Sequence, residues 1–99
     1  MARASVEFHA EARAEYLAAV SWYGERSPRA ANSFEAEFSQ AIEQIRRSPG
    51  SGSVYMKGCR RLLLHQFPFH IVYQSSTDAI FVLAVAHTHR RPGYWRQRL

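Results

Sequence analysis

Two segments in the first half of the chain repeat apolar residues at the three- and four-residue spacing of an amphipathic helix. The first runs from about Ala10 to Arg26. The second begins at Ser27-Pro28, where serine suits an N-cap and proline suits the first helical position, and ends in Arg46-Arg47. Because the turn between them is very short, the two segments predict an antiparallel helical hairpin. Its apolar stripes are Ala12, Tyr16, Ala19, Val20 and Tyr23 in the first helix and Phe34, Phe38, Ala41, Ile42 and Ile45 in the second.

The other apolar segments follow the period of β-strands. Val6 and Phe8 alternate with polar neighbours ahead of the first helix. Turn-like residues occupy 51–58, and three strands are predicted after them, at Arg60–Leu64, Phe69–Gln74 and Ile80–Ala86. The last is nearly all apolar, as a strand covered on both faces would be. The order β-α-α-β-β-β predicts an α+β fold, with the helical hairpin packed on one side of a mostly antiparallel four-stranded sheet.

The size of the chain fits a single domain. Its 99 residues are too few for two compact domains, so we expect one domain over residues 1–99. Cys59 is the only cysteine, and a hydrophobic content of 46% supplies a core without disulfides or metals. No apolar run approaches the roughly 20 residues of a membrane span, and no signal-peptide pattern follows Met1. We therefore expect a soluble cytoplasmic protein that does not bind membranes.

Charge is distributed unevenly along the chain, whose formal net charge is +5. Residues 1–45 contain four arginines and seven glutamates, a net −3. Residues 46–99 contain eight arginines, Lys57 and one acid, Asp78, a net +8. A basic half of this kind indicates a surface for nucleic acid or an acidic partner. The alternative is a basic face that serves only solubility. The clustering of arginines at Arg60-Arg61 and Arg90-Arg91 argues against this alternative.

The C-terminal segment 87–98 combines the residue types of a ribonuclease site or of a nucleic-acid-binding surface. Histidine moves protons near neutral pH, arginine pairs with phosphates, and aromatic faces stack on bases. The candidates for proton transfer are His70, His87, His89 and Tyr94. The candidates for target binding are Lys57, Arg60, Arg61, Arg90, Arg91, Trp95, Arg96 and Arg98. Two of these residues also have a purely structural interpretation that stays open. Trp95 could cap the edge of the core, and His70 could be an ordinary half-exposed strand residue.

Other kinds of site are not predicted. His87 and His89, two apart along a strand, would point the same way, but no further ligands lie nearby in sequence to complete a metal site. Gly50-Ser51-Gly52 follows a helix rather than preceding one, which is the wrong order for a phosphate loop. We expect no metal, no cofactor and no small-molecule substrate. The glutamates of the helical hairpin are expected to form a solvated face, and they are Glu11, Glu15, Glu25, Glu35, Glu37 and Glu43.

Short stretches along the whole chain carry a resemblance to a known family. The chain opens with Val6-Glu7-Phe8-His9-Ala10-Glu11-Ala12 and, after the helical hairpin, has Arg60-Arg61-Leu62. Phe67-Pro68-Phe69-His70-Ile71-Val72-Tyr73 follows, and then Val85-Ala86-His87 and Arg90-Arg91-Pro92-Gly93-Tyr94-Trp95. In order, spacing and length these stretches resemble the RelE/ParE toxin superfamily of type II toxin–antitoxin systems, especially its plasmid-stabilisation-like branch.

The resemblance implies a toxin that is neutralised by a cognate antitoxin encoded beside it. It leaves two targets open, ribosome-bound mRNA cut by a RelE-type endoribonuclease and DNA gyrase poisoned by a ParE-type toxin. Against the RelE pattern, Arg61 and Tyr94 match, whereas Leu63 and His70 stand where that pattern has basic residues. Thr88 stands near its last arginine, with Arg90 and Arg91 close by. The alternative from a different class is a non-toxic basic nucleic-acid-binding accessory protein, or an inactive toxin relic.

Overall fold

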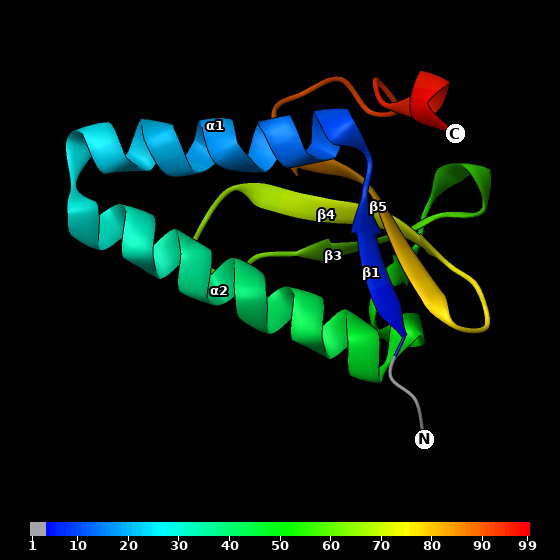
Figure 1. The fold of residues 1–99 in the computed structure, drawn as a ribbon. Helices are drawn as coiled ribbons and strands as arrows, with labels where there is room; N and C mark the ends of the chain where they lie inside the picture. Colours follow the sequence, from blue (N-terminus) through cyan, green and yellow to red (C-terminus); the bar gives the residue numbers. More distant parts are fainter. Residues whose placement is uncertain (1–3) are drawn as a thin grey trace.

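The computed structural model describes residues 4–99, and its elements follow the predicted order with one addition. Strand β1 (Ser5–Phe8) leads into α1 (Ala10–Arg26) and α2 (Pro28–Arg47), which form the antiparallel hairpin (Figure 1). The second half contains β2 (Ser53–Val54), β3 (Arg60–Leu63), β4 (Phe69–Ser75) and β5 (Ala79–His87). Short 3₁₀ turns lie at Pro49–Ser51, Met56–Gly58 and Arg96–Arg98. The predicted α+β class is thereby confirmed.

Local capping explains where the two helices begin. The His9 imidazole Nδ1 accepts a hydrogen bond from the backbone N–H of Glu11 at 3.1 Å, so His9 is the N-cap of α1. The Ser27 hydroxyl accepts from the N–H of Ala30 at 3.3 Å, and Pro28 occupies the first helical position. No helix within residues 4–99 has the combination of length and apolarity that crossing a membrane requires.

The five strands form one mixed sheet in the order β1-β5-β4-β3-β2. Strands β3, β4 and β5 are an antiparallel meander, and β1 lies parallel to β5 with Ser5 opposite Ala79 and Phe8 opposite Val82. The prediction of four strands was wrong by one, because residues 53 and 54 pair with β3 instead of remaining in a turn.

The added strand β2 is held in place by Tyr73. The Tyr73 hydroxyl donates to the carbonyl of Pro49 at 2.6 Å and accepts from the N–H of Gly52 at 3.0 Å. A Cβ on Gly52 would lie 2.6 Å from that hydroxyl and 2.8 Å from the carbonyl oxygen of Arg61. Only glycine lets the chain approach β3 this closely, which is why a glycine-rich segment ends in a strand pair.

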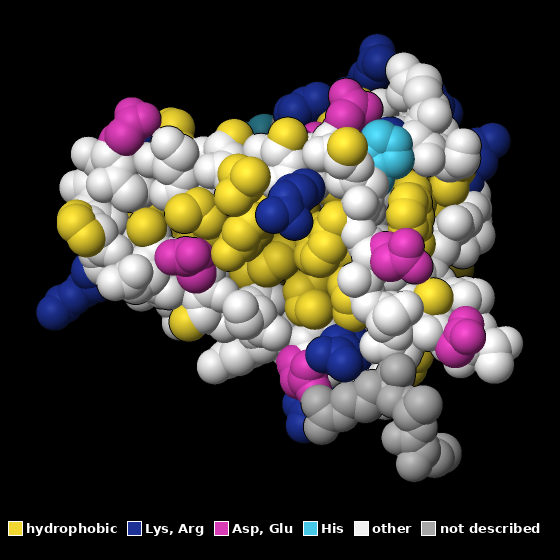
Figure 2. Space-filling model, viewed as in Figure 1, with side chains coloured by type: hydrophobic (Ala, Val, Ile, Leu, Met, Phe, Trp, Pro, Cys, Tyr) yellow, Lys and Arg dark blue, Asp and Glu magenta, His cyan; other side chains and the backbone are white. Residues whose placement is uncertain are grey.

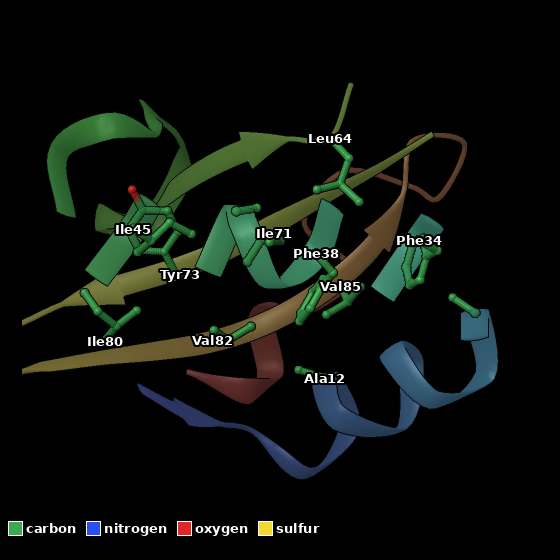
Figure 3. Packing of buried hydrophobic residues seen from close by; sticks show 12 residues of the cluster. Ala12, Phe34, Phe38, Ile45, Leu64, Ile71, Tyr73, Ile80, Val82 and Val85 are labelled. Carbon is green, nitrogen blue, oxygen red and sulfur yellow. The ribbon is translucent and has the colours of Figure 1, made fainter. Parts of the chain in front are cut away.

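The sheet is covered on both faces, but by different elements. Helices α1 and α2 cover one face, where Phe34, Phe38 and Ile45 pack against Ile71, Tyr73 and Val85 (Figures 1 and 3). The opposite face is covered by the C-terminal segment and the loop before β3, which surround a smaller buried cluster. That cluster comprises Cys59, Val72, Leu83, Ala84, Ala86 and Trp95. Coverage on both sides accounts for the nearly continuous apolar run of β5.

We expect the F38A substitution to lower the free energy of unfolding by roughly 3–5 kcal/mol, because it leaves a cavity in the core. Phe38 is 5% exposed, and its ring centroid lies 4.4 Å from that of Tyr16. Urea unfolding measures the change. F81A is the matched control, since Phe81 is 36% exposed, and it should cost less than about 1 kcal/mol. Equal costs for the two substitutions would contradict this packing.

Candidate functional site

The edge of β5 changes its partner halfway along the strand. Strand β1 pairs with it only as far as Val82, where the N–H of His9 donates to the Val82 carbonyl at 2.9 Å before α1 begins. Beyond that point, the N–H of Val85 donates to Glu15 of α1 at 3.0 Å, and the carbonyl of Leu83 accepts from Arg98 at 3.0 Å. Side chains therefore complete the backbone hydrogen bonding that a neighbouring strand would otherwise provide.

Glu15 is the centre of this arrangement. Its two carboxylate oxygens each accept from the Arg98 guanidinium at 2.9 Å, and one of them also accepts from the Tyr94 hydroxyl at 2.6 Å. Its side chain is 16% exposed, and that of Arg98 is 9% exposed. Arg98 also lies 3.5 Å from Glu11, which is 68% exposed. These bonds fasten the C-terminal segment to the first half of α1, and the ribbon of the segment lies beside that part of the helix in Figure 1. We call Glu15, Tyr94 and Arg98 the anchor.

The anchor fixes the protonation of its members. Burial raises the pKa of Glu15, but the hydrogen bonds from Arg98, Tyr94 and Val85 outweigh it, so the net pKa is lowered. Burial and the hydrogen bond to Glu15 raise the pKa of Tyr94 well above its usual value. Tyr94 therefore stays protonated and donates to a carboxylate, so it is poorly suited to act as a general base.

Three of the predicted site residues serve packing in this structure. Trp95, predicted among the target-binding residues, is 1% exposed and belongs to the core of the far sheet face, so the alternative of a core cap describes it. Its indole is covered by the protein and offers no face on which a base can stack. Arg98 and Tyr94 are tied to Glu15, so neither presents its polar end freely to a target.

The predicted histidines lie on opposite faces of the sheet. His70 is 9% exposed and lies on the far face, with its ring centroid 6.0 Å from that of Tyr55. His87 lies on the helix-covered side, 5.2 Å from the ring of Phe69 and 5.0 Å from that of His89. The N–H of His89 donates to Nδ1 of His87 at 3.0 Å. The sheet thus separates His70 from the other two.

Burial and the nearby Arg61 guanidinium lower the pKa of His70, so its imidazole is largely neutral at pH 7. No cluster of three or more histidine, cysteine or acidic side chains that could hold a metal occurs within the described part of the chain.

The basic residues that were predicted to bind a target, apart from Arg98, fall into two groups. Arg60 and Arg61 are partly buried: Arg60 donates to the carbonyl of Gly52 at 2.8 Å, and the Arg61 guanidinium lies 4.4 Å from the centre of the Tyr55 ring. The other group is exposed, although Arg90 stacks over Tyr94 at 3.8 Å and Arg96 bonds the carbonyl of Gly93 at 3.0 Å. This exposed group, which we call the basic rim, consists of Lys57, Arg90, Arg91 and Arg96.

Sequence reasoning missed two carboxylates by assigning all the helical glutamates to a solvated face. Glu15 is one, although its position carries a signal: it is three residues after Ala12 and four before Ala19, both buried. A carboxylate on the apolar side of a helix needs a partner. Glu37 is the other, and it accepts from the N–H groups of His65 and Gln66 in the turn after β3. Nothing in the local sequence around Glu37 indicates that role.

The fold and surface define a small basic α+β domain, with a helical hairpin on one sheet face and an arginine-rich C-terminal segment on the other. Residues 6–92 match the model of the family described as the ParE toxin of the type II toxin–antitoxin system parDE, so the chain belongs to this family.

The fold is also found in a solved structure, titled as a chromosomal ParDE toxin–antitoxin system from P. aeruginosa. Its TM-score is 0.72 at 17% sequence identity, over 85% of this chain and 95% of that chain. A search of curated proteins found no match. The match to the ParE toxin family confirms the resemblance to RelE/ParE toxins that the sequence stretches indicated.

We expect E15Q to destabilise the fold by roughly 2–4 kcal/mol, because it removes a hydrogen-bonded charge pair with little solvent access. Chemical denaturation measures the loss. E11Q removes the same charge one turn earlier on α1 and also faces Arg98, but it should cost far less because Glu11 is mostly exposed. Comparable losses in the two variants would contradict the role of the anchor.

The contribution of Glu15 should also depend on pH. Its folded pKa lies below the ordinary value of 4.5, so its stabilisation is complete above that pH and is lost as the pH falls through the folded pKa. The stability difference between the natural protein and E15Q should therefore narrow in acid. A difference that stays constant between neutral pH and strongly acidic solution would contradict the lowered pKa.

Proposed function

We propose that this ParE-family toxin acts by binding DNA gyrase rather than by cutting mRNA, and that a cognate antitoxin neutralises it. One observation carries the choice between the two targets: the candidate proton-transfer groups are divided between the two faces of the sheet. His70 lies on one sheet face, His87 and His89 lie on the other, and Tyr94 is tied to Glu15.

Cleavage of RNA requires a base near the 2′-hydroxyl, an acid near the leaving oxygen, and cations for the charge that develops on the phosphate. His70 has Arg61 beside it, and the described residues that line the same cavity include no second histidine and no acid. Tyr94 reaches the same cavity, but its hydroxyl already donates to Glu15. This separation favours a toxin that acts by binding its target over one that acts by catalysis.

The basic rim suits such a role because it stands on a rigid support. Its three arginines follow the buried strand β5, and the anchor holds the end of that segment. Arginine is enriched among the residues that dominate protein–protein binding energy. Arg90 and Arg91 are both exposed at the end of β5. We therefore place the gyrase-binding surface there, with Lys57 and Arg96 at its margins.

The group His87, His89 and Arg90 is the one observation that favours the second candidate, a ribosome-dependent endoribonuclease. The two imidazoles are adjacent, and His87 and Arg90 line the same groove. That groove is walled mainly by apolar side chains such as Trp22, Tyr23 and Phe69. Its apolar walls suit a protein segment better than a phosphodiester, so we rank this candidate second.

Two apolar grooves along α1 provide surface for an antitoxin. One, of about 340 Å³, lies between α1, α2 and β1 and is lined by Phe8, Tyr16, Leu17, Phe38 and Ile42; Figure 2 shows apolar side chains gathered there. The other, of about 450 Å³, lies between α1, the start of β4 and the end of β5. We propose that the antitoxin lays an extended or helical segment across these grooves and partly over the basic half.

Expression of this chain alone should arrest bacterial growth, and coexpression of the short gene beside it should restore growth. The toxin–antitoxin family and the open apolar surface along α1 motivate this expectation. The net +8 of residues 46–99 should make association with an acidic antitoxin faster at low ionic strength. Growth curves and stopped-flow association at several salt concentrations measure both effects. Normal growth at high soluble expression would contradict an active toxin.

R90A and R91A should each weaken gyrase binding by about 1–3 kcal/mol, as hot-spot truncations do. H87A and H89A should leave growth arrest largely intact, because no proton transfer is required. Supercoiling assays with purified gyrase, run beside cleavage assays on ribosome-bound mRNA, measure the outcome. R29A is the matched control, since Arg29 is exposed at the start of α2 and far along the chain from the rim. Cleavage of ribosome-bound mRNA that H87A abolishes would overturn the gyrase assignment.

A further inference from the structure

One arginine of the basic rim rests on an aromatic ring of the C-terminal segment. The guanidinium carbon of Arg90 lies 3.8 Å from the centre of the Tyr94 ring. Arg90 is exposed, whereas Tyr94 is partly buried. An arginine over an aromatic face gains a cation–π contact while its edge remains in water. The ring therefore restricts the orientation of a charged group that a target can still reach.

A single turn brings the ring beneath the guanidinium. The N–H of Tyr94 donates to the carbonyl of Arg91 at 3.2 Å, which closes a turn with Pro92 and Gly93 at its centre. Gly93 has a φ of 78°, the positive value that the third position of a type II turn requires. Because the chain reverses at this point, Tyr94 comes to lie under Arg90.

The ring is itself fixed at its other end. The Tyr94 hydroxyl donates to Glu15 of α1 at 2.6 Å, and the Arg98 guanidinium carbon lies 5.2 Å from the ring centre. Arg98 is held in turn by the same carboxylate at 2.9 Å. Arg90 therefore rests on a support that the anchor connects to the edge of the sheet.

The neighbouring Arg91 has no such support. It is exposed, and its guanidinium has no ring, carboxylate or carbonyl partner within residues 4–99. A side chain that is free before binding loses rotamer freedom when a partner orders it, and this loss weakens binding. Arg90 and Arg91 therefore differ in how ready they are to bind, although both are exposed and carry the same charge.

We propose that Tyr94 is a positioning residue, whose ring holds the Arg90 guanidinium ready for a carboxylate of the target. Arg90 rather than Arg91 is then the principal arginine of the gyrase-binding surface. This inference rests on the proposed function, because it concerns the same surface. A carboxylate suits the site, since it pairs with the edge of a guanidinium through two parallel hydrogen bonds and leaves the face on the ring. Tyr94 transfers no proton in this role.

The test compares two replacements of Tyr94 for binding to purified gyrase. Y94F keeps the ring, so it should lose less than about twofold in affinity, even though the lost bond to Glu15 lowers the stability of the fold. Y94L removes the ring and should weaken binding by about three- to tenfold, because Arg90 must then be ordered by the target. Equal weakening by Y94F and Y94L, in step with their losses of stability, would overturn the proposal.

Double variants show whether Tyr94 acts through Arg90. In an R90A background, Y94L should weaken binding further by less than about twofold, because the group that the ring holds is gone. R91A is the matched background, in which Y94L should keep its full effect. R90A alone should also weaken binding more than R91A alone. An undiminished effect of Y94L in the R90A background, or a larger loss in R91A than in R90A, would contradict the proposal.

The NMR signals of the Arg90 side chain report on the pair without gyrase. The ring should displace these signals in the natural chain and in Y94F, and the displacement should vanish in Y94L. Signals that are the same in all three chains would overturn the role of the ring. A natural chain that does not bind gyrase would overturn the proposed function, while this comparison still decides whether Tyr94 holds Arg90.

A second pair of variants serves if Y94L does not fold. R90K keeps the positive charge but removes the planar group that stacks on the ring, so it should weaken gyrase binding by about threefold or more. R91K is its matched control and should change binding by less than about twofold, because Arg91 has no ring beneath it. Equal losses in R90K and R91K would overturn the proposal.

Discussion

The structure depends on one carboxylate that replaces a strand. Strand β1 leaves the edge of β5 after Val82, and the next backbone groups of β5 would be left unpaired without Glu15 and Arg98. The same two side chains hold the C-terminal segment over the far sheet face, which buries Trp95. The Glu15 carboxylate therefore links the completion of the sheet, the second core and the position of the basic rim.

This link also determines which chemistry the site can perform. Tyr94 is an attractive acid or base when the sequence is considered alone, but here its hydroxyl donates to Glu15 and its deprotonation is disfavoured. His70 of β4 lies opposite Ala86 of β5, the neighbour of His87. Because successive side chains along a strand point to opposite faces, His70 and His87 lie on different sides of the sheet. The sheet thus separates His70 from His87 and His89, while Arg90, Arg91 and Arg96 stay exposed.

The parts of the fold that sequence could predict are those determined by local spacing. Both helices begin and end close to their predicted residues because apolar periodicity, Pro28 and the serine caps act within a few positions. Strand β2 and the anchor could not be predicted, because each depends on partners that are distant in the sequence. Tyr73 is 21 residues from Gly52, and Arg98 is 83 residues from Glu15. The arrangement of the candidate site residues could not be predicted, since no sequence pattern shows that the sheet divides the histidines.

The basic half of the chain raises the question of whether its charge serves recognition or only solubility. A face that serves solubility keeps its guanidinium groups in water, where each donor is satisfied. Arg61 departs from this expectation in one respect, because its Nε is buried without an acceptor in the described chain, while its guanidinium lies 4.4 Å from the centre of the Tyr55 ring. The contact with Tyr55 offsets part of the free-energy cost of burying that donor. Arg90, Arg91 and Arg96, which are exposed, are the groups of the basic half that keep their charge in water.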